Sequence, residues 1–507
     1  DTGAQYLEDI STAYWFSEVL FAAVEMEVFS SLERGGKTIE ELSEEFKSDT
    51  GGMERFLHAL ETLGLVYRHG PRYYNTRLSS DYLVTGNDNY QGNSILWRKY
   101  LSEQWKALPQ CIRAGGRVDF GPGDKDTVMR IERMRRYIDA MDSVAKAKMH
   151  EIASLFEGVS LEGGILDVGA GSGAISAGFL ERFPLLRAVL MDLPEVIDYC
   201  STMIEKRGLK KRVSCCGTNI LEAWPVSKKS FSLVILSNIV HAFSEKEAAG
   251  LLQKASECLT DNGYLIVHDL FLEHFPQKAA LFDLNMFINT YNGRVFSRKW
   301  IEEELSRLGL HKTGFIPLKT DTAIIVASKN KEGIGRIITD PKQQLISKFL
   351  DIGFSQVLPV TVKDIHVSEW TDLRCRFGCD SYGKPHCPPN SPSSQKTREA
   401  LKDYTHALLL EGEPPTQSFQ LKVLKAEGEA FKSGFHKAFA YWAGPCSICD
   451  NCTVDIEGIC TNTANARPSM EGSGIDVFET VRKSGTSLRT LRDKNDFVKY
   501  FGLLLLE

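Results

Sequence analysis

The stretch ILDVGAGSGAIS, residues 165–176, decides the fold of the central part of the chain. An apolar run typical of a strand leads into a glycine-rich turn, and a helical pattern follows. Gly169, Gly171 and Gly173 permit a tight turn and the close approach of a ligand to the backbone. The helix that follows adds unpaired N–H groups at its first turn. The stretch therefore predicts a ligand-binding loop at the end of a strand.

The residues around this loop continue the strand–helix alternation. Six apolar runs alternate with helical patterns, and the expected strands are 164–169, 187–192, 212–217, 231–237, 264–269 and 322–328. Such alternation is typical of a Rossmann-like, mostly parallel sheet covered on both faces. Asp192 ends the second run, about 20 residues after the loop, where an acid can bind ribose hydroxyls. The spacing G-x-G-x-G differs from the dinucleotide fingerprint G-x-G-x-x-G, so S-adenosylmethionine is favoured over NAD.

Residues 1–85 predict short helices followed by a hairpin, which is the pattern of a winged helix. Thr38 and Glu41 form a capping-box pattern before one helix, and a turn at Gly70-Pro71 separates the two hairpin strands. Winged helices commonly bind DNA, but this segment has 7 Lys and Arg against 15 Asp and Glu, a net charge of −8. Because phosphate binding needs a positive surface, a dimerisation module is the better interpretation. The net charge of the whole chain, −6, also gives no sign of a nucleic-acid partner.

On the glycine loop, Asp192 and the segment LSNIVHAFSEKE (236–247), residues 1–328 resemble class I methyltransferases of the plant and bacterial O-methyltransferase group. The resemblance implies a homodimer formed through an N-terminal winged-helix dimerisation domain, S-adenosylmethionine as cofactor, and a small-molecule methyl acceptor. The cofactor-binding residues that it implies are Asp167, Gly169, Gly171, Gly173, Asp192, Leu193, Gly217, Thr218, Asn219 and Ser237.

The same resemblance points to a candidate catalytic pair. His241 matches the general-base histidine of the group's L-H-D-W segment, although Ala242-Phe243 replaces the Asp-Trp. An imidazole near neutral pKa suits removal of a proton from a hydroxyl or thiol. Asp269, after the next strand, is expected to orient His241, and a purely structural histidine is the alternative. The expected walls of the acceptor pocket, which could equally be helix-packing residues, are Met286, Asn289 and Tyr291.

Seven of the twelve cysteines lie between 375 and 460. Cys446, Cys449 and Cys452 are spaced C-x2-C-x2-C, with Cys460 following, as in ferredoxin-like iron–sulfur sites. Zinc is the alternative, although zinc sites prefer two C-x2-C pairs separated by a longer loop. Clustered cysteines in a chain without an export signal, a signal-peptide pattern or a long apolar run favour a reducing, cytoplasmic location and no membrane partner.

The remaining three cysteines, Cys375, Cys379 and Cys387, are spaced C-x3-C-x7-C. The seven cysteines therefore complete one four-cysteine cluster and leave a second cluster with three. That second cluster would have one open iron unless His366, His386 or a carboxylate fills the position. The radical S-adenosylmethionine triplet C-x3-C-x2-C is absent, so that chemistry is disfavoured.

Both clusters are expected to be of the 4Fe-4S type.

Residues 365–507 resemble a family of metal-binding proteins without a defined reaction. The motifs that carry the resemblance are CRFGCDSYGKPHCPP (375–389), GPCSICDNC (444–452) and RPSMEGSGIDVF (467–478). In that third motif, Arg467, Glu471 and the glycines either close over a cluster or form a turn.

The expected organisation is multidomain, α+β and α/β. A winged-helix dimerisation domain (1–95) and a helical connector (96–160) precede the S-adenosylmethionine-binding domain (161–328). A linker (329–340) leads to an α+β cysteine-rich iron–sulfur domain (341–507). The leading hypothesis is a methyltransferase whose acceptor binds at the three-cysteine cluster. The alternatives are methyl transfer coupled to reduction, with an electron donor as a further partner, and a binding protein that senses S-adenosylmethionine and oxygen.

Overall fold

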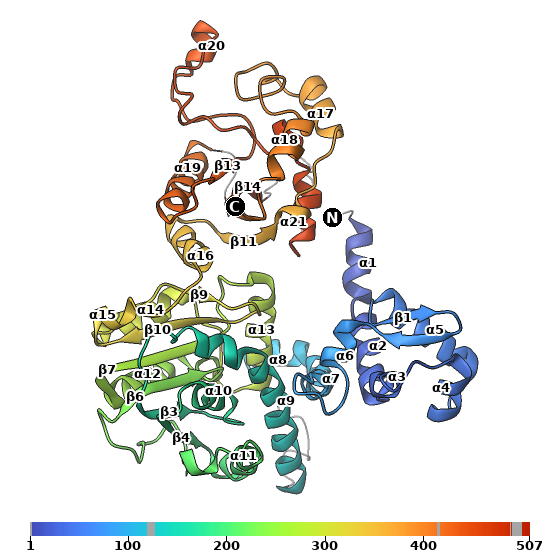
Figure 1. The fold of residues 1–507 in the computed structure, drawn as a ribbon, viewed down its shortest axis with the longest axis vertical. Helices are drawn as coiled ribbons and strands as arrows, with labels where there is room; N and C mark the ends of the chain where they lie inside the picture. Colours follow the sequence, from blue (N-terminus) through green and yellow to red (C-terminus); the bar gives the residue numbers. More distant parts are fainter. Residues whose placement is uncertain (1–2, 119–126, 413–415, 487, 489–498) are drawn as a thin grey trace. The chain divides into compact units, whose positions relative to one another are not determined.

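The computed structural model describes residues 3–118, 127–412, 416–486, 488 and 499–507. The chain divides into two compact units, of which the first is residues 9–338 and the second is residues 339–507 together with residues 3–8 (Figure 1). The boundary falls within the expected linker 329–340, which contains a short helix, α15 (Lys331–Ile334). Among the described residues, none of the helices combines the length and the apolar character that a membrane span requires.

The N-terminal part of the chain forms short helices and an antiparallel hairpin, as the sequence predicts. These elements are α1 (Ala4–Thr12), α2 (Tyr14–Glu25), α3 (Val28–Leu32), α4 (Ile39–Phe46), α5 (Thr50–Thr62), β1 (Val66–His69), β2 (Arg72–Asn75) and α6 (Arg77–Tyr82). Helix α4 starts with the expected capping box, because Thr38 Oγ1 accepts from Glu41 N and Glu41 Oε2 accepts from Thr38 N. Leu42, Leu57 and Leu60 are fully buried in the core between these helices and the hairpin.

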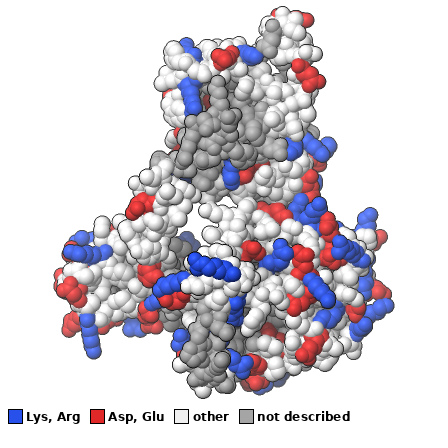
Figure 2. Space-filling model, turned by 180° about the vertical axis from the view of Figure 1, so that it is seen from behind, with Lys and Arg blue, Asp and Glu red and all other residues white. Residues whose placement is uncertain are grey.

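A helical segment links these elements to the central sheet. It contains α7 (Gly92–Trp105), α8 (Leu108–Ala114) and the long α9 (Thr127–Ser154). Helix α9 packs against both α7 and the first helix of the central sheet, so it joins the two parts of the unit. On the face shown in Figure 2, basic and acidic side chains are interspersed over this unit.

The central sheet has the strand order β5-β4-β3-β6-β7-β10-β8, with β9 also paired to β10. Its strands are β3 (Gly163–Val168), β4 (Leu186–Asp192), β5 (Val213–Gly217), β6 (Phe231–Ser237), β7 (Leu259–Asp269), β8 (His311–Lys312), β9 (Ile316–Pro317) and β10 (Ala323–Ser328). Strands β3 to β7 pair in parallel, and β10 pairs antiparallel to β7. All six expected strands are present, whereas the two-residue strands β8 and β9 were not expected.

Helices cover both faces of this sheet. They are α10 (Ala174–Arg182), α11 (Pro194–Lys206), α12 (Glu245–Cys258), α13 (Pro276–Asn289) and α14 (Arg298–Arg307). The strand order runs outward from β3 to β5 and then reverses at β6, so right-handed connections place α12 on the face opposite to α10 and α11. Neighbouring residues such as Ile165 and Leu166 are both fully buried, as expected for a sheet covered on both faces. The reversal between β3 and β6 creates the crevice at which such sheets bind ligands.

The second unit is built on a four-stranded antiparallel sheet of order β11-β12-β14-β13. Its elements are α16 (Pro341–Ile352), β11 (Gln356–Thr361), α17 (Trp370–Gly378), α18 (Ser394–Leu401), β12 (His406–Gly412), α19 (Gln417–Lys432), β13 (Phe439–Tyr441), α20 (Thr453–Glu457), α21 (Val477–Lys483) and β14 (Tyr500–Leu505). Leu409 and Leu503 pair across the middle of the sheet and are fully buried. The cysteine-containing segments lie outside the sheet, in α17 and in the connections that follow α17 and β13.

Candidate functional site

A cavity of about 380 Å³ lies at the carboxyl ends of the parallel strands in the first unit. Six of the expected cofactor residues line it, namely Asp167, Gly169, Gly171, Asp192, Leu193 and Ser237. Gly173 begins α10 with a φ of 72°, between the lining residues Ser172 and Ala174. The volume falls within the range of about 300–1,000 Å³ that is usual for small-molecule sites.

Asp192 holds the glycine loop in place. Its Oδ2 accepts a hydrogen bond from Gly171 N at 2.9 Å, and its Oδ1 accepts one from Leu193 N at 2.7 Å. Burial raises the pKa of this carboxyl, while the two backbone N–H groups oppose the shift. A carboxylate at the end of the second parallel strand can accept hydrogen bonds from the two hydroxyls of a ribose, so the cavity fits an adenosyl ligand.

Asp167 lies deeper than Asp192. Its Oδ2 accepts a hydrogen bond from Ser176 Oγ at 2.6 Å, which ties the end of β3 to the first turn of α10. Burial raises the pKa of Asp167 to about 6, and the hydrogen bond from Ser176 opposes the shift. The interaction stabilises the strand–turn–helix arrangement that the opening stretch predicts.

The three residues expected beside the adenine lie next to the cavity rather than in its lining. Gly217 ends β5, and Thr218 and Asn219 follow it. Thr218 N donates a hydrogen bond to Asp192 O at 2.7 Å, which places this turn beside the acidic residue. A contact of Gly217, Thr218 and Asn219 with adenine therefore stays a prediction.

The helical connector supplies cavity walls that the sequence did not identify. The lining residues from α7 and α9 are Trp97, Arg130, Arg133, Met134, Tyr137, Ile138, Met141 and Ala145. No local motif marks these side chains. The sequence of residues 90–160 shows a helical pattern, but this pattern does not tell which side of each helix faces the cavity.

The expected catalytic pair lies at the same edge of the sheet. His241 follows β6, and Asp269 ends β7. Asp269 Oδ1 accepts a hydrogen bond from His241 Nδ1 at 2.5 Å, and Oδ2 accepts one from His241 N at 3.2 Å. Both side chains are buried. Because Nδ1–H donates to the carboxylate, the lone pair of the neutral ring is at Nε2, where it can accept a proton.

Helix α13 packs beside His241 and carries the expected acceptor-pocket residues. The ring of Phe282 meets the imidazole edge to face, with centroids 5.1 Å apart. Met286 is buried, and Asn289 Nδ2 donates to Asn285 Oδ1 at 3.0 Å. Tyr291 lies beyond the helix with 84% of its surface exposed. The structure therefore brings Phe282 to His241, and a role of Met286, Asn289 and Tyr291 in acceptor binding stays a prediction.

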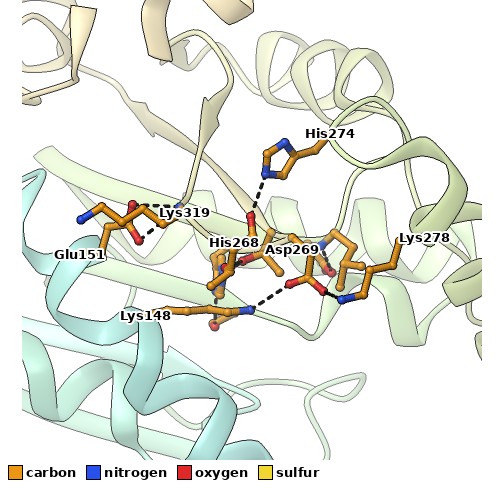
Figure 3. Close-up of polar contacts among 12 residues, drawn as sticks. Lys148, Glu151, His268, Asp269, His274, Lys278 and Lys319 are labelled. Carbon is orange, nitrogen blue, oxygen red and sulfur yellow. Dashed lines mark hydrogen bonds and ion pairs between the residues drawn. The ribbon is translucent and has the colours of Figure 1, made fainter. Parts of the chain in front are cut away.

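A polar network, buried around His268 and exposed at Lys278, supports this edge of the sheet (Figure 3). The His268 ring forms two hydrogen bonds, one between Nδ1 and Ser237 Oγ at 2.8 Å and one between Nε2 and Thr322 Oγ1 at 2.9 Å. Burial lowers the pKa of His268 well below its ordinary value. Lys148 and Lys278 approach the carboxylate of Asp321 from two sides, at 3.6 and 2.5 Å. The network joins α9, α13 and the start of β10 to the strand that ends in Asp269.

In the second unit, Cys375, Cys379 and Cys387 line one cavity of about 370 Å³. Burial, with the neighbouring thiols of Cys379 and Cys375, raises the pKa of the Cys387 thiol to about 11. Charged and aromatic side chains complete the lining, including Arg374, Glu471, Lys499, Trp370 and Tyr382. Desolvation by the surrounding protein raises the pKa of the Glu471 carboxyl. The residue itself is still exposed, because it lines the cavity.

Cys446, Cys449, Cys452 and Cys460 line a much smaller cavity of about 20 Å³. His386 lines the same cavity. Its place in the sequence next to Cys387 suggests instead a role at the three-cysteine set. Both of its ring nitrogens are buried without a hydrogen-bond partner. Within the described part of the chain, no three Cys, His, Asp or Glu side chains converge on a position that would hold a single ion. Two groups of soft sulfur ligands, with orphaned imidazole nitrogens beside one of them, fit iron–sulfur clusters.

The two charged residues of the third motif have separate surroundings. Arg467 forms an ion pair with Glu427 of α19, with Nη2 2.6 Å from Oε1 and Nε 2.9 Å from Oε2. Arg467 also lies over the ring of Phe439, 5.6 Å from its centroid. Arg467 therefore stabilises the packing of α19, and of these two residues it is Glu471 that lines the three-cysteine cavity.

Comparison with protein families divides the chain in the same way. Residues 8–85 match the O-methyltransferase dimerisation domain, and residues 109–311 match the O-methyltransferase domain. Residues 359–506 match a family described as "Predicted metal-binding protein".

Curated relatives match the first unit. The 3-hydroxy-5-methyl-1-naphthoate 3-O-methyltransferase of Streptomyces sahachiroi is 25% identical over 292 residues, which cover 56% of this chain and 83% of the relative. The acetylserotonin O-methyltransferase of Bos taurus is 25% identical over 305 residues, which cover 57% of this chain and 87% of the relative.

Solved structures show the same fold. Human N-acetylserotonin methyltransferase in complex with SAM has a TM-score of 0.57 at 22% identity, covering 65% of this chain and 98% of that one. An O-methyltransferase family protein from Burkholderia thailandensis has a TM-score of 0.57 at 24% identity, covering 65% of this chain and 99% of that one.

Proposed function

Because the chain belongs to the S-adenosylmethionine-dependent O-methyltransferases and carries a domain of the metal-binding family, we propose that it methylates a small molecule bound or activated at a three-cysteine iron–sulfur cluster. The observation that carries the proposal is the contrast between the two cysteine cavities. The three-cysteine cavity has a volume of about 370 Å³, whereas the four-cysteine cavity has about 20 Å³. A cluster would occupy part of the larger cavity, whose volume lies in the range of about 300–1,000 Å³ that is usual for small-molecule sites.

In this proposal the 380 Å³ cavity of the first unit holds the cofactor. S-adenosylmethionine supplies an electrophilic methyl group when bound. Asp192 binds the ribose hydroxyls, and Gly169 and Gly171 let the loop backbone approach the ligand. Asp167 and Gly173 hold the loop in shape, Leu193 and Ser237 line the cavity, and the turn of Gly217, Thr218 and Asn219 contacts the adenine.

His241 takes the proton of the acceptor at Nε2. Asp269 keeps Nδ1 protonated and fixes the orientation of the ring through its 2.5 Å hydrogen bond. The carboxylate also stabilises the imidazolium that forms after proton transfer. Methyl transfer needs the acceptor atom about 3 Å from the methyl carbon, in line with the leaving sulfur, so a fixed base and a fixed acceptor both lower the barrier.

The second unit contributes the proposed cluster sites. Cys375, Cys379 and Cys387 would hold a cluster through three of its irons, and Cys446, Cys449, Cys452 and Cys460 would hold a second cluster through four. A cluster with an open iron supplies Lewis acidity toward a hydroxyl, thiol or carboxylate. Arg374, Lys499 and Glu471 give the larger cavity charges of both signs, which can orient a polar acceptor.

A cysteine variant tests this assignment. We expect Cys379→Ala to abolish transfer of labelled methyl from S-adenosylmethionine to a panel of phenols, while the Kd for S-adenosylmethionine stays unchanged. The panel includes 3-hydroxy-5-methyl-1-naphthoate and acetylserotonin, the acceptors named for two relatives. Cys215→Ala is the matched control, because Cys215 is an exposed cysteine of β5 in the other unit. Full turnover by cluster-free protein would show that the cluster takes no part in acceptor binding.

The N-terminal domain is proposed to form a homodimer. Residues 8–85 match a dimerisation domain, and α2 begins with three large side chains, Tyr14, Trp15 and Phe16, that are each about 60% exposed (60%, 58% and 62%). A cluster of exposed aromatic residues is typical of a protein interface. The same surface would be costly for a monomer to expose.

A second candidate function is methyl transfer coupled to reduction, with the clusters as electron carriers. The observation that favours it is that the two cysteine cavities are adjacent, because consecutive residues line them: His386 lines the smaller cavity and Cys387 lines the larger one. Turnover that proceeds with oxidised clusters and without a reductant would exclude this candidate.

A further inference from the structure

His386 is a buried side chain with two unmet polar atoms. Only 9% of its surface is exposed, and neither Nδ1 nor Nε2 has a hydrogen-bond partner. Among the described residues, it is the one side chain that leaves two buried polar atoms unpaired. Leaving a buried donor or acceptor without a partner costs free energy, because the group loses its hydrogen bonds to water. A neutral imidazole has one donor and one acceptor, so a partner at this position would recover part of that cost.

The surroundings of His386 identify the kind of partner. The cavity that it lines is otherwise walled by Cys446, Cys449, Cys452 and Cys460 together with a few small and polar residues. Asn462 already donates a hydrogen bond from Nδ2 to Cys449 Sγ at 3.4 Å in this cavity. Donors directed at sulfur are typical of the shell around an iron–sulfur cluster, where they tune its reduction potential.

His386 also stands at a junction between two sites. Its neighbour in the chain, Cys387, is buried and lines the 370 Å³ cavity with Cys375 and Cys379. The backbone here is tied down, because Cys387 N donates to Lys384 O at 3.0 Å and Asn390 N donates to Cys387 O at 2.8 Å. One peptide bond therefore connects a side chain of the four-cysteine cavity to a ligand of the three-cysteine cavity.

We propose that His386 donates a hydrogen bond from its imidazole to a sulfur of the four-cysteine iron–sulfur cluster, and that the His386–Cys387 peptide couples this cluster to the three-cysteine site. The inference rests on the cluster assignment of the proposed function. Four cysteines already complete the ligand set of that cluster, so the imidazole acts as a donor rather than as a ligand. An N–H group directed at sulfur stabilises the more negative, reduced cluster and raises its reduction potential.

Isotope labelling of the whole protein tests the contact without any substitution. Protein is prepared without oxygen from cells supplied with ¹⁴N- or ¹⁵N-histidine, reduced with dithionite and studied by pulsed EPR. We expect a weak nitrogen coupling that changes with the histidine isotope. A full complement of iron and sulfide without histidine coupling would overturn this inference alone. A strong coupling, typical of direct iron–nitrogen ligation, would overturn the donor role.

Variants separate the donor role from general packing. We expect His386→Leu to lose the histidine coupling and to shift the midpoint potential of one cluster to a more negative value, and His386→Asn to restore part of the shift. The matched control is His436→Gln, since His436 is an exposed histidine of the same unit. An unchanged potential in His386→Leu would contradict the proposal, and if that variant loses its cluster, the labelled protein decides. Protein without iron and sulfide would overturn both this inference and the proposed cluster sites.

Discussion

At the scale of single residues, the His241–Asp269 pair is the arrangement on which the proposed chemistry depends. The carboxylate accepts hydrogen bonds from the ring and from the backbone N–H groups of His241 and Leu270. It is therefore held independently of any ligand, and it holds the ring in turn. A base that is oriented before the acceptor arrives loses little entropy in the reaction.

We expect His241→Gln to lower the rate of methyl transfer to the phenol panel by about 10²–10⁴-fold, the usual contribution of a general base. The Kd for S-adenosylmethionine should stay the same, because His241 is not part of the cofactor cavity lining. His311→Gln, at an exposed histidine of β8, is the control. Equal turnover by the two variants would mean that His241 has only a structural role.

The candidate residues differ in how far the sequence could identify them. The resemblance to the O-methyltransferase group identifies His241 and Asp269, and their places after β6 and at the end of β7 agree with a site at that edge of the parallel sheet. The place of His386 beside the four-cysteine loop was not predictable from the sequence, since 60 residues separate it from Cys446 and no spacing rule joins them. Tyr137 was missed for a similar reason, because it faces the cofactor cavity from a long helix without a motif.

At the scale of secondary-structure elements, the glycine loop shows how close packing limits the sequence. Gly173 has a φ of 72°, and a Cβ there would lie 2.7 Å from Leu190 Cδ1 and 3.0 Å from Ile204 Cδ1. Gly171 has a φ of 54°, but the nearest atom to its Cβ would be Ile138 Cδ1 at 3.9 Å. At both positions a side chain is unfavourable because the backbone has a positive φ. At Gly173 a side chain would also be too close to its neighbours in the core.

The free energy of unfolding should reflect this difference. We expect Gly171→Ala to lower it by about 1–2 kcal/mol through backbone strain. Gly173→Ala should lower it by a further 1–3 kcal/mol, roughly the cost of overpacking a core. Urea unfolding followed by circular dichroism measures both. Equal destabilisation by the two substitutions would show that α10 and β4 can move apart to make room.

The buried histidine at the end of β7 predicts a loss of stability in acid. Burial lowers the pKa of His268 well below the value of about 6.5 that it has in an unfolded chain. Between the two pKa values the unfolded chain binds a proton that the folded protein does not, so stability falls as the pH drops below about 6.5. Above that pH both states are neutral and the effect vanishes.

We expect the unfolding free energy of the first unit to fall by up to about 1.4 kcal/mol per pH unit for this histidine as the pH is lowered from about 6.5 toward 5. Burial also lowers the pKa of His274, which adds to the slope. Urea titrations at several pH values measure it, with His311→Gln as a control that should leave the slope unchanged. Because burial raises the pKa of Asp167 to about 6, that carboxyl takes up a proton in the folded protein and opposes the slope in the lower part of this range. A His268→Gln variant with an unchanged slope would show that His268 takes up its proton as readily in the folded protein as in the unfolded chain.

The elements themselves were largely predictable. Strands β3, β4, β6, β7 and β10 have apolar runs because they are largely buried on both faces, and that pattern needs no knowledge of the partners. The edge strand β5 has an apolar run although none of its residues is buried. Strands β8 and β9 have two residues each, too few for a periodic signal. In the second unit the sequence identified the two cysteine sets, but not the four-stranded antiparallel sheet that carries them.

At the scale of the whole molecule, the N-terminal aromatic residues predict the oligomeric state. We expect Trp15→Glu to convert a dimer into a monomer in sedimentation velocity experiments, because it places a charge in the proposed apolar interface. Leu185→Glu is the control, since Leu185 is 72% exposed just before β4. A dimer that survives Trp15→Glu would place the interface elsewhere.

The proposed function depends on the presence of both units in one chain. The first unit has a cofactor cavity and an oriented base, and the second has two sets of cysteines around cavities of very different size. A cluster held by Cys375, Cys379 and Cys387 would occupy one part of the 370 Å³ cavity, whose lining extends to Trp370 and Tyr500. The size of that cavity is the reason to expect a bound molecule there.

The most direct measurement is the EPR spectrum of protein purified without oxygen, recorded with S-adenosylmethionine and with each phenol of the panel, beside a count of iron and sulfide. We predict about eight irons and eight sulfides per chain, as two 4Fe-4S clusters require, and one cluster signal that shifts when an acceptor binds. The shift should be absent in Cys379→Ala. Zinc without sulfide, or two cluster signals that no acceptor shifts although methyl transfer occurs, would contradict the account.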